Sequence, residues 1–283
     1  MSTSAAQSGA EHGPASGIHP TAIVAAGARI PASCTVGPWC TIGPNVTLGE
    51  DCRLISHVVL GADEAGHLTL GRGNIIYPFA CVGIAPQDLK YAGESTRCVI
   101  GDNNTVREYV TISRGTTGGG GVTTVGNGCL IMAYTHIGHD SHIGNGCILA
   151  NSATLAGHVT VEDYAVVGAL CPVHQYCRIG RYSYIGGGTT ITQDVLPYSL
   201  TSIERNNHAY GLNKVGLERR GFTPAQLKQL RHAYHLLQAS RLNTTDALAA
   251  IRATLAESTE PETTEHVRYL ADFIANSQRG IIK

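Results

Sequence analysis

The sequence predicts a parallel β-helix followed by a small helical domain, and three observations carry this prediction. Aliphatic residues recur at every sixth position over most of the chain, which is typical of short strands wound into coils. The chain has 34 Gly among 283 residues but only 3 Phe and 1 Trp, which suits the narrow interior of a solenoid. Beyond Pro197 the period of six gives way to the spacing of an α-helix.

The repeat runs without a slip through the middle of the chain. Each step of six residues reaches an aliphatic side chain, and we expect these side chains to fill the interior of the coil. The positions are Val125, Ile131, Ile137, Ile143, Leu149, Leu155, Val161, Val167, Val173, Ile179, Ile185 and Ile191. With three flat faces to a coil, three hexads complete one turn, so each residue should lie beside the residue eighteen positions further on.

The first part of the chain carries the same repeat with interruptions. Its aliphatic positions are Ile18, Val24, Ile30, Val36, Ile42, Leu48, Leu54, Leu60, Leu70, Ile76, Val82, Ile100, Val106 and Ile112. Residues 61–69, 83–99 and 113–124 break the step. Because the interior has no room for extra residues, we expect these segments to leave the stack as external loops, and long loops are often functional.

The chain therefore divides into three parts. Residues 1–16 are small, polar and aperiodic, and we expect a flexible lead-in. Residues 17–199 are predicted to form the β-helix, and residues 200–283 a C-terminal helical domain. A unit as small as this last one is expected to pack on the β-helix or on a neighbouring subunit.

Three helices are predicted in the C-terminal domain. The first follows Thr223-Pro224, a cap residue and a proline at the first helical position. The second opens near Thr245 and continues to about residue 256, and the third runs from Thr263 to about residue 277.

Seven of the nine cysteines occupy the fifth position of a hexad. They are Cys34, Cys40, Cys52, Cys129, Cys147, Cys171 and Cys177. That position otherwise holds Ala, Ser, Thr or Val, so we interpret these thiols as small side chains in an inward-facing slot, not as disulfides or metal ligands. Free thiols in this number indicate a reducing compartment.

Charge and hydropathy favour no nucleic-acid or membrane partner. The formal net charge is −1, and the sequence shows neither a signal peptide nor an apolar run of spanning length. We therefore expect a cytoplasmic protein without stable membrane insertion.

The coil arithmetic gathers histidines on one side of the prism. His139, His158 and His174 belong to hexads that begin eighteen residues apart, so they should lie on successive coils about 4.8 Å from one another. His136 lies three residues before His139, and Gly157 takes the prism position of His139 one coil on. The sequence therefore predicts a functional histidine cluster.

This cluster suits general-base catalysis. A neutral imidazole can take a proton from a hydroxyl at neutral pH. Asp140 directly follows His139. Because adjacent side chains on a strand point to opposite faces, two interpretations of Asp140 stay open: a turn carboxylate, or the group that orients the base.

Two other classes of protein share part of this pattern. Trimeric β-helix carbonic anhydrases bind zinc through three histidines, and His136, His139 and His142 are spaced by three residues. Side chains three apart on a strand do not all converge, so we expect no metal and no cofactor. A non-enzymatic scaffold predicts regular threonine ladders without charged external loops, whereas the 83–99 segment carries Asp88 and Lys90.

Seven motifs resemble those of the UDP-N-acetylglucosamine acyltransferases that begin lipid A synthesis. They are QDLKYAG (87–93), ISRGT (112–116), HIGHD (136–140), LANSATLAGHV (149–159), VHQYC (173–177), GLNKVGLERRGF (211–222) and the terminal SQRGII. A hexapeptide repeat alone is shared by many acyltransferases, but these motifs in this order are specific. The resemblance covers the chain from about residue 18 to its C-terminus.

The resemblance implies a left-handed parallel β-helix and a homotrimer with active sites in clefts between subunits. It implies transfer of an (R)-3-hydroxyacyl group from acyl carrier protein to the 3-hydroxyl of UDP-N-acetylglucosamine. In that reaction His139 is the general base, with Asp140 beside it, and the backbone N–H of Gly157 stabilises the thioester oxyanion.

The resemblance also implies which residues bind substrate, in the first long loop, the histidine cluster and the start of the C-terminal domain. They are Asp88, Lys90, His136, His158, His174, Gln175, Asn213, Arg219 and Arg220. Among them, Asn213 and Arg220 are expected to hold uridine, and Arg219 the phosphates, through charge-assisted hydrogen bonds. Met132 and Gly187 take the positions that limit acyl length, where a glycine leaves room for a longer chain.

The chain departs from the family pattern in two places. Val215 stands where many members carry a glutamate that contacts the nucleotide, and the segment 203–207 is one residue longer. One alternative keeps the fold and changes the acceptor: an N-acyltransferase acting on a UDP-amino sugar, because the two acceptors differ by a single atom.

Overall fold

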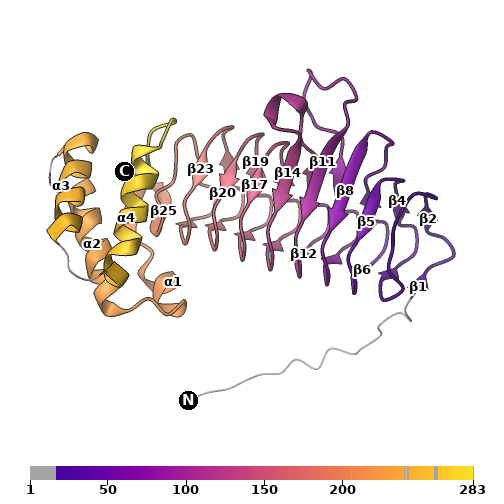
Figure 1. Cartoon of the computed structure of the whole chain (residues 1–283), viewed down its shortest axis with the longest axis horizontal. Coiled ribbons are helices and arrows are strands. Elements are labelled where there is room, and N and C mark those ends of the chain that lie inside the picture. Colours follow the sequence, from indigo (N-terminus) through magenta and orange to yellow (C-terminus); the bar gives the residue numbers. More distant parts are fainter. Residues whose placement is uncertain (1–16, 205, 239, 241, 258–260, 283) are drawn as a thin grey trace, which may run out of the picture.

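The computed structural model describes residues 17–282, except residues 205, 239, 241 and 258–260 (Figure 1). The predicted lead-in, residues 1–16, lies outside the described residues. Figure 1 shows coils of short strands advancing along one axis, with the helices gathered at the C-terminal end. The coils are built on three sheets, here named A, B and C.

Sheet A has 11 strands in the described residues, of which the last two, β25 and β26, form an antiparallel hairpin. They are β1 (Gly17–Ile18), β3 (Thr35–Val36), β6 (Arg53–Leu54), β9 (Ile75–Ile76), β12 (Thr105–Val106), β15 (Leu130–Ile131), β18 (Ile148–Leu149), β21 (Val166–Val167), β24 (Tyr184–Ile185), β25 (Ser199–Glu204) and β26 (Asn206–Leu212). The hairpin continues sheet A into residues that the sequence analysis assigned to the C-terminal helical domain. The predicted boundary at residue 199 stays a prediction.

Sheets B and C are parallel throughout the described strands, with eight and seven strands. Sheet B holds β2 (Ile23–Val24), β4 (Thr41–Ile42), β7 (Val59–Leu60), β10 (Cys81–Ile84), β13 (Thr111–Ser113), β16 (His136–Ile137), β19 (Thr154–Leu155) and β22 (Pro172–Val173). Sheet C holds β5 (Val46–Leu48), β8 (Gly66–Leu70), β11 (Thr96–Ile100), β14 (Val122–Val125), β17 (His142–Ile143), β20 (Thr160–Val161) and β23 (Arg178–Ile179). The register confirms the predicted coil of eighteen residues, since His136 pairs with Thr154.

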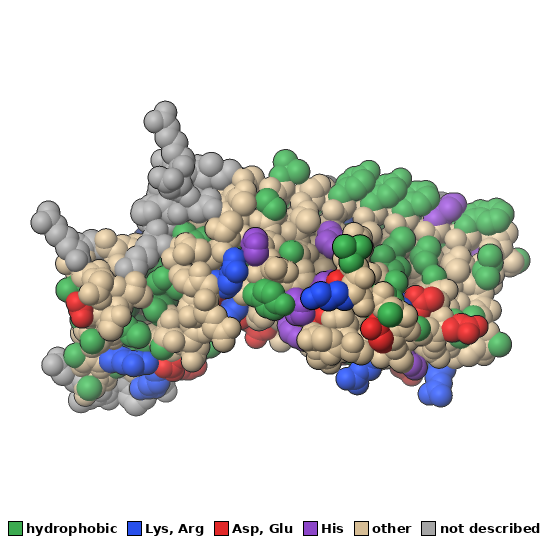
Figure 2. Space-filling view, turned by 90° about the horizontal axis from the view of Figure 1, so that it is seen from above, with side chains coloured by type: hydrophobic (Ala, Val, Ile, Leu, Met, Phe, Trp, Pro, Cys, Tyr) green, Lys and Arg blue, Asp and Glu red, His purple; other side chains and the backbone are tan. Residues whose placement is uncertain are grey.

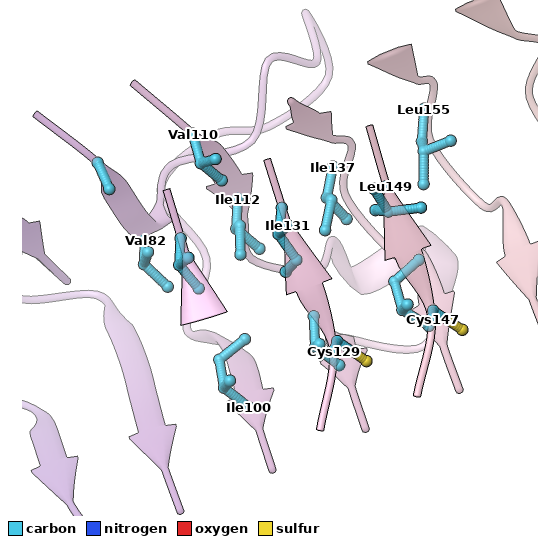
Figure 3. Packing of buried hydrophobic residues seen from close by; sticks show 14 of the residues in the cluster. Val82, Ile100, Val110, Ile112, Cys129, Ile131, Ile137, Cys147, Leu149 and Leu155 are labelled. Atoms are coloured by element: carbon cyan, nitrogen blue, oxygen red, sulfur yellow. The ribbon is translucent and has the colours of Figure 1, made fainter. Parts of the chain in front are cut away.

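The interior is filled as the repeat predicts. From Val125 to Ile191 every sixth residue is at most 3% exposed, and the seven fifth-position thiols are at most 2% exposed. Figure 3 shows the aliphatic side chains and the thiols of Cys129 and Cys147 packed together. Ile18 is 50% exposed because it stands on the first described coil, where no preceding described coil covers it.

The three interruptions are shorter loops than expected, because each ends in a longer strand of sheet C. β8 and β11 alternate buried and exposed residues, the pattern of a strand with one face on the core. Residues 85–95 then remain as a loop between β10 and β11, and a short 3₁₀-helix, η1 (Thr117–Gly119), precedes β14.

The predicted helices are confirmed, with ends that differ by a few residues: α2 (Pro224–Gln238), α3 (Thr244–Glu257) and α4 (Pro261–Ala275). A shorter helix, α1 (Lys214–Arg219), was not predicted. Thr223 and Gln226 exchange side chain-to-backbone hydrogen bonds at the start of α2, which is a capping box. In the described part of the chain, no helix combines the length and apolarity needed to cross a bilayer.

The helical domain packs on the β-helix, as expected. The Tyr269 hydroxyl of α4 donates to Glu162 Oε2 at 2.6 Å, and the Arg178 guanidinium lies 4.0 Å from the ring centre of Phe273. The domain has a core of its own that includes Leu230, Leu270 and the buried Tyr198.

Candidate active site

His139 and Asp140 lie together at the corner between sheets B and C. Asp140 adopts a left-handed backbone conformation, with φ of 57°, so the chain turns and the two neighbouring side chains converge. His139 Nδ1 lies 2.8 Å from Asp140 Oδ2, and Asp140 is 2% exposed. Of the two interpretations left open, the contact favours the group that orients the imidazole, because the strand rule does not hold at a corner.

Asp140 is held in place by β14 and by the segment that precedes it. Its Oδ1 accepts the Thr116 N–H at 2.9 Å, its Oδ2 accepts the Thr116 hydroxyl at 2.6 Å, and its own N–H donates to Thr123 Oγ1 at 2.8 Å. Gly119 of η1 covers the carboxylate so closely that a Cβ there would lie 2.1 Å from Asp140 Cγ. Gly119, in the interruption of residues 113–124, therefore covers this carboxylate.

This arrangement fixes the tautomer of His139. An ionised carboxylate only accepts hydrogen bonds, so the imidazole proton lies on Nδ1 and Nε2 keeps its lone pair. Thr116 was not among the predicted site residues. It lies inside an interruption, where the coil arithmetic assigns no position.

Gly157 lies directly under the imidazole, as the coil arithmetic predicted. A Cβ on Gly157 would lie 2.7 Å from His139 Nε2 and 2.7 Å from Cε1. The N–H of His158 donates to His139 O at 2.9 Å and ties the two coils together. The Gly157 N–H donates to none of the residues that the structure describes, so it is available to a ligand beside Nε2.

His158 and His136 flank His139. The ring of His158 meets that of His139 edge-on at 5.1 Å between centroids and stacks on Tyr176 at 4.5 Å. His136 Nδ1 lies 2.7 Å from Thr111 Oγ1. Tyr176 was missed, although it lies eighteen residues after His158.

Burial lowers the pKa of both flanking histidines. For His136, desolvation is the main cause and the charge of His139 adds to it. For His158, desolvation again lowers the pKa, against the opposing charges of Asp140 and Asp88. Both imidazoles therefore favour the neutral form more than a free histidine does.

Asp88 and Lys90 lie on the loop of residues 85–95. Asp88 Oδ1 accepts the N–H of Lys90 at 3.0 Å, and its carbonyl accepts the N–H of Tyr91 at 3.0 Å, so the segment is a tight turn. The Tyr91 hydroxyl accepts a hydrogen bond from the Arg114 guanidinium. Since the charge of Asp88 acts on His158, the turn lies on the side of the histidine cluster.

His174 and Gln175 lie one coil beyond His158 and are exposed. His174 Nδ1 is 3.1 Å from the guanidinium of Arg279, near the C-terminus. None of the described contacts joins His174 to His139 or His158. The structure therefore places His174 on the next coil without contact to those two rings.

A separate pocket, of about 800 Å³, lies over the outer face of sheet A. It is lined by Asn213, Arg219, Arg220 and Val215, together with β-helix residues such as Tyr182. The Arg220 guanidinium is 4.3 Å from the ring centre of Tyr164.

Asn213 also has a structural task in this pocket. Its Oδ1 accepts the Gly216 N–H at 3.2 Å and caps α1, and its Nδ2 donates to the carbonyl of Tyr182 at 3.1 Å. Both polar atoms of the Asn213 side chain, which was predicted to hold uridine, thus already have hydrogen-bond partners in the same chain.

The three histidines of the zinc alternative do not come together. His136 lies in β16 of sheet B and His142 in β17 of sheet C, and each ring contacts a threonine hydroxyl. His139, Asp140 and His158 do bring one ligand atom each to within 4.8 Å of one another. Both Asp140 oxygens, however, already accept hydrogen bonds from Thr116.

Coils of hexapeptide repeats that carry a histidine against a buried carboxylate are typical of the hexapeptide-repeat acyltransferases. Comparisons with known proteins agree. Residues 123–157 match the bacterial transferase hexapeptide family (six repeats), and residues 194–282 match a family described as UDP N-acetylglucosamine O-acyltransferase, domain 2.

Relatives extend this match over nearly the whole chain. The acyl-[acyl-carrier-protein]–UDP-N-acetylglucosamine O-acyltransferase of Myxococcus xanthus is 44% identical over 94% of this chain and 99% of its own. The Francisella novicida UDP-N-acetylglucosamine acyltransferase structure superposes with a TM-score of 0.87 at 38% identity, covering 94% of this chain and 93% of the other. The Moraxella catarrhalis enzyme superposes with a TM-score of 0.85 at 39% identity, over 94% and 99%. The chain belongs to the UDP-N-acetylglucosamine O-acyltransferase family and has its left-handed parallel β-helix.

Proposed function

We propose that this chain transfers an (R)-3-hydroxyacyl group from acyl carrier protein to the 3-hydroxyl of UDP-N-acetylglucosamine, with His139 as the general base. The reaction is the first step of lipid A biosynthesis. The observation that carries the mechanism is the contact of 2.8 Å between His139 Nδ1 and the buried Asp140, which leaves Nε2 free above Gly157.

The chemistry follows from the free lone pair on Nε2. Nε2 takes the proton of the sugar 3-hydroxyl while that oxygen attacks the thioester carbonyl. The Gly157 N–H donates to the oxyanion that forms, a contribution of about 3 kcal/mol where such a donor is well placed. The intermediate collapses, the C–S bond breaks, and the departing thiolate takes the proton from the imidazolium. Asp140 stabilises the imidazolium between these steps.

The flanking groups bind the sugar and the reacting atoms. Neutral His136 and His158 serve as hydrogen-bonding groups that do not compete with His139 for a positive charge. Asp88 and Lys90 supply a carboxylate and an ammonium from the loop of residues 85–95.

The nucleotide half of each site comes from a neighbouring subunit. His139 lies at the edge between sheets B and C, whereas the pocket with Arg219 and Arg220 lies on the outer face of sheet A. In a three-sided prism, the edge between two faces lies opposite the third face. One chain therefore cannot present both halves to one sugar nucleotide, and a homotrimer with clefts between subunits can. His174 and Gln175 complete that cleft.

An exposed aromatic column supports the trimer. The rings of His57, Phe79, Tyr109 and Tyr134 follow one another on successive coils at 4.8–5.0 Å. Phe79, Tyr109 and Tyr134 are 44%, 45% and 60% exposed. Figure 2 shows hydrophobic side chains lined up along one edge of the β-helix. A continuous apolar strip of this kind indicates a surface that another chain covers.

The acyl chain runs along the corner after sheet A. Met132 directly follows β15, and Gly187 follows β24 three coils on. A Cβ on Gly187 would lie 3.3 Å from the carbonyl oxygen of Ala169. Because glycine has no side chain, the surface at this position does not project into the path proposed for the acyl chain. We propose that these positions set the length of the acyl group.

Oxygen is favoured over nitrogen as the acceptor. The Myxococcus xanthus relative and the Moraxella catarrhalis structure both carry O-acyltransferase names. Turnover of the 3-hydroxy sugar nucleotide should exceed that of its 3-amino analogue, and a preference for the amine would reverse the assignment.

The central test removes the base. His139→Ala should lower the rate by about 10²–10⁴ while the fold is kept. His142→Ala is the matched control, because that imidazole lies on sheet C and contacts Thr124 instead of Asp140. Equal loss in the two variants, or more than about a tenth of parental activity in His139→Ala, would show that another group is the base.

A further inference from the structure

We propose that Arg114 is a positioning residue that holds the loop of residues 85–95, and with it Asp88 and Lys90, at the reaction site. This inference rests on the proposed function and deepens it. It gives Arg114 a role beside that of Thr116, which lies in the same ISRGT motif and holds Asp140.

Arg114 carries its charged guanidinium into the interior, where a charge is costly to bury. The residue is 1% exposed, and among the fully buried side chains it is one of the largest. Its Nη1 lies 2.7 Å from Asp63 Oδ2, whose side chain is 42% exposed. Its Nε is buried and finds no hydrogen-bond partner within the described residues. An apolar side chain would fill such a site at less cost, so stability is a weak explanation for the guanidinium.

The guanidinium is the attachment point of the loop. Within the described residues, one hydrogen bond joins residues 85–95 to another part of the chain, and in it Arg114 Nη2 donates to the Tyr91 hydroxyl. The Tyr91 hydroxyl itself donates to the carbonyl of Glu94 at 3.0 Å. Tyr91 is also bonded through its N–H to Asp88, so fixing the phenol fixes the turn that carries the two charged residues.

The surroundings make room for this side chain. Gly66 lies against it so closely that a Cβ there would be 2.7 Å from Arg114 Nη1. Nη1 also donates to the carbonyl of Gly83, at the end of β10, at 3.4 Å. The guanidinium thus reaches Asp63, β10 and the loop at once, which a planar fork of five donors can do and an ammonium cannot.

One short segment therefore supports three parts of the site. Thr111 contacts His136, Thr116 holds Asp140, and Arg114, between them, reaches the loop. Arg114 acts at a distance from the reacting atoms, so its loss should change sugar-nucleotide binding and leave the base unchanged.

The test uses Tyr91→Phe, which removes the hydroxyl and keeps the ring, beside Arg114→Lys. Tyr77→Phe is the control, since that ring lies under Arg107 and not in the loop. Tyr91→Phe should lower kcat/KM for the sugar nucleotide by about tenfold or more, mainly through KM, as expected for a lost hydrogen bond to a charged group. The pH profile of kcat and Tm should match the parent, and hydrogen exchange of residues 85–95 should accelerate.

Asp88→Ala and Lys90→Ala, measured alongside, separate the two ways in which the inference can fail. If they lose activity while Tyr91→Phe and Arg114→Lys keep parental kinetics, Arg114 does not position the loop and the proposed function stands. If they keep parental kinetics themselves, the loop lies outside the site, and both this inference and the assignment of sugar contacts are wrong. Parallel losses of Tm and activity in Tyr91→Phe would show a purely structural role.

Discussion

Replacing Gly157 by alanine tests the site through the position of one atom. The new Cβ would lie 2.7 Å from His139 Nε2 and Cε1, whereas an ordinary contact is about 3.5 Å. The imidazole must therefore move by about 0.8 Å, away from Gly157 and out of line with Asp140. Misplacement of a catalytic group by about 1 Å can cost about 10²-fold in rate.

We expect kcat of Gly157→Ala to fall by about 100-fold in an initial-rate assay with 3-hydroxyacyl carrier protein, with little change in KM or Tm. The backbone N–H is kept, so the loss reports the displaced imidazole of His139. Gly118→Ala is the matched control, because its Cβ meets nothing within 4 Å. If Gly157→Ala kept more than half of the parental kcat, the imidazole would not work from the position described.

Three further predictions concern binding, assembly and pH. Arg220→Ala should weaken sugar-nucleotide binding by about 1.5–3 kcal/mol in calorimetry, and unchanged affinity would remove it from the site. Tyr109→Glu, in the middle of the aromatic column, should shift the mass seen by light scattering from that of the proposed trimer towards the 29.8 kDa chain, whereas an unaltered mass would place the interface elsewhere. Burial lowers the pKa of His136 in the folded chain, whereas in the unfolded chain this pKa is near 6.5. Below about pH 6.5 the unfolded chain therefore binds more protons at this residue than the folded chain does. The free energy of unfolding therefore has its full contribution from His136 above about pH 6.5 and loses it as the pH falls through the lowered pKa of the folded chain. Tm should follow this course, and His136→Gln should flatten it.

The repeat predicted the sheets and the core because its period is set by sterics. A coil interior accepts one aliphatic side chain per hexad, so Val125 to Ile191 could be placed without any knowledge of the structure. The same arithmetic placed Gly157 under His139, because parallel coils keep their register over eighteen residues.

The arithmetic fails where the chain leaves the repeat. Thr116 and Arg114 lie in an interruption, so no spacing predicts that they reach Asp140 and Tyr91. Asp140 itself was left between two interpretations, because the alternation of side chains holds along a strand and is lost at a corner with positive φ. The hairpin β25–β26 was missed since it belongs to the sheet by pairing and not by period.

The two ends of the β-helix differ in how they are covered, and this sets where the molecule opens first. At the C-terminal end the hairpin and Tyr198 bury the last coil under the helices, whereas Ile18 on the first described coil is 50% exposed. In a stack where each coil touches only its neighbours, stability is a sum of local interfaces and opening proceeds from the weaker end. Fraying should therefore enter from the N-terminal side and must melt several coils before it reaches His139. Amide exchange should rise steadily from β16 towards β1, so that the chemistry outlasts partial unfolding.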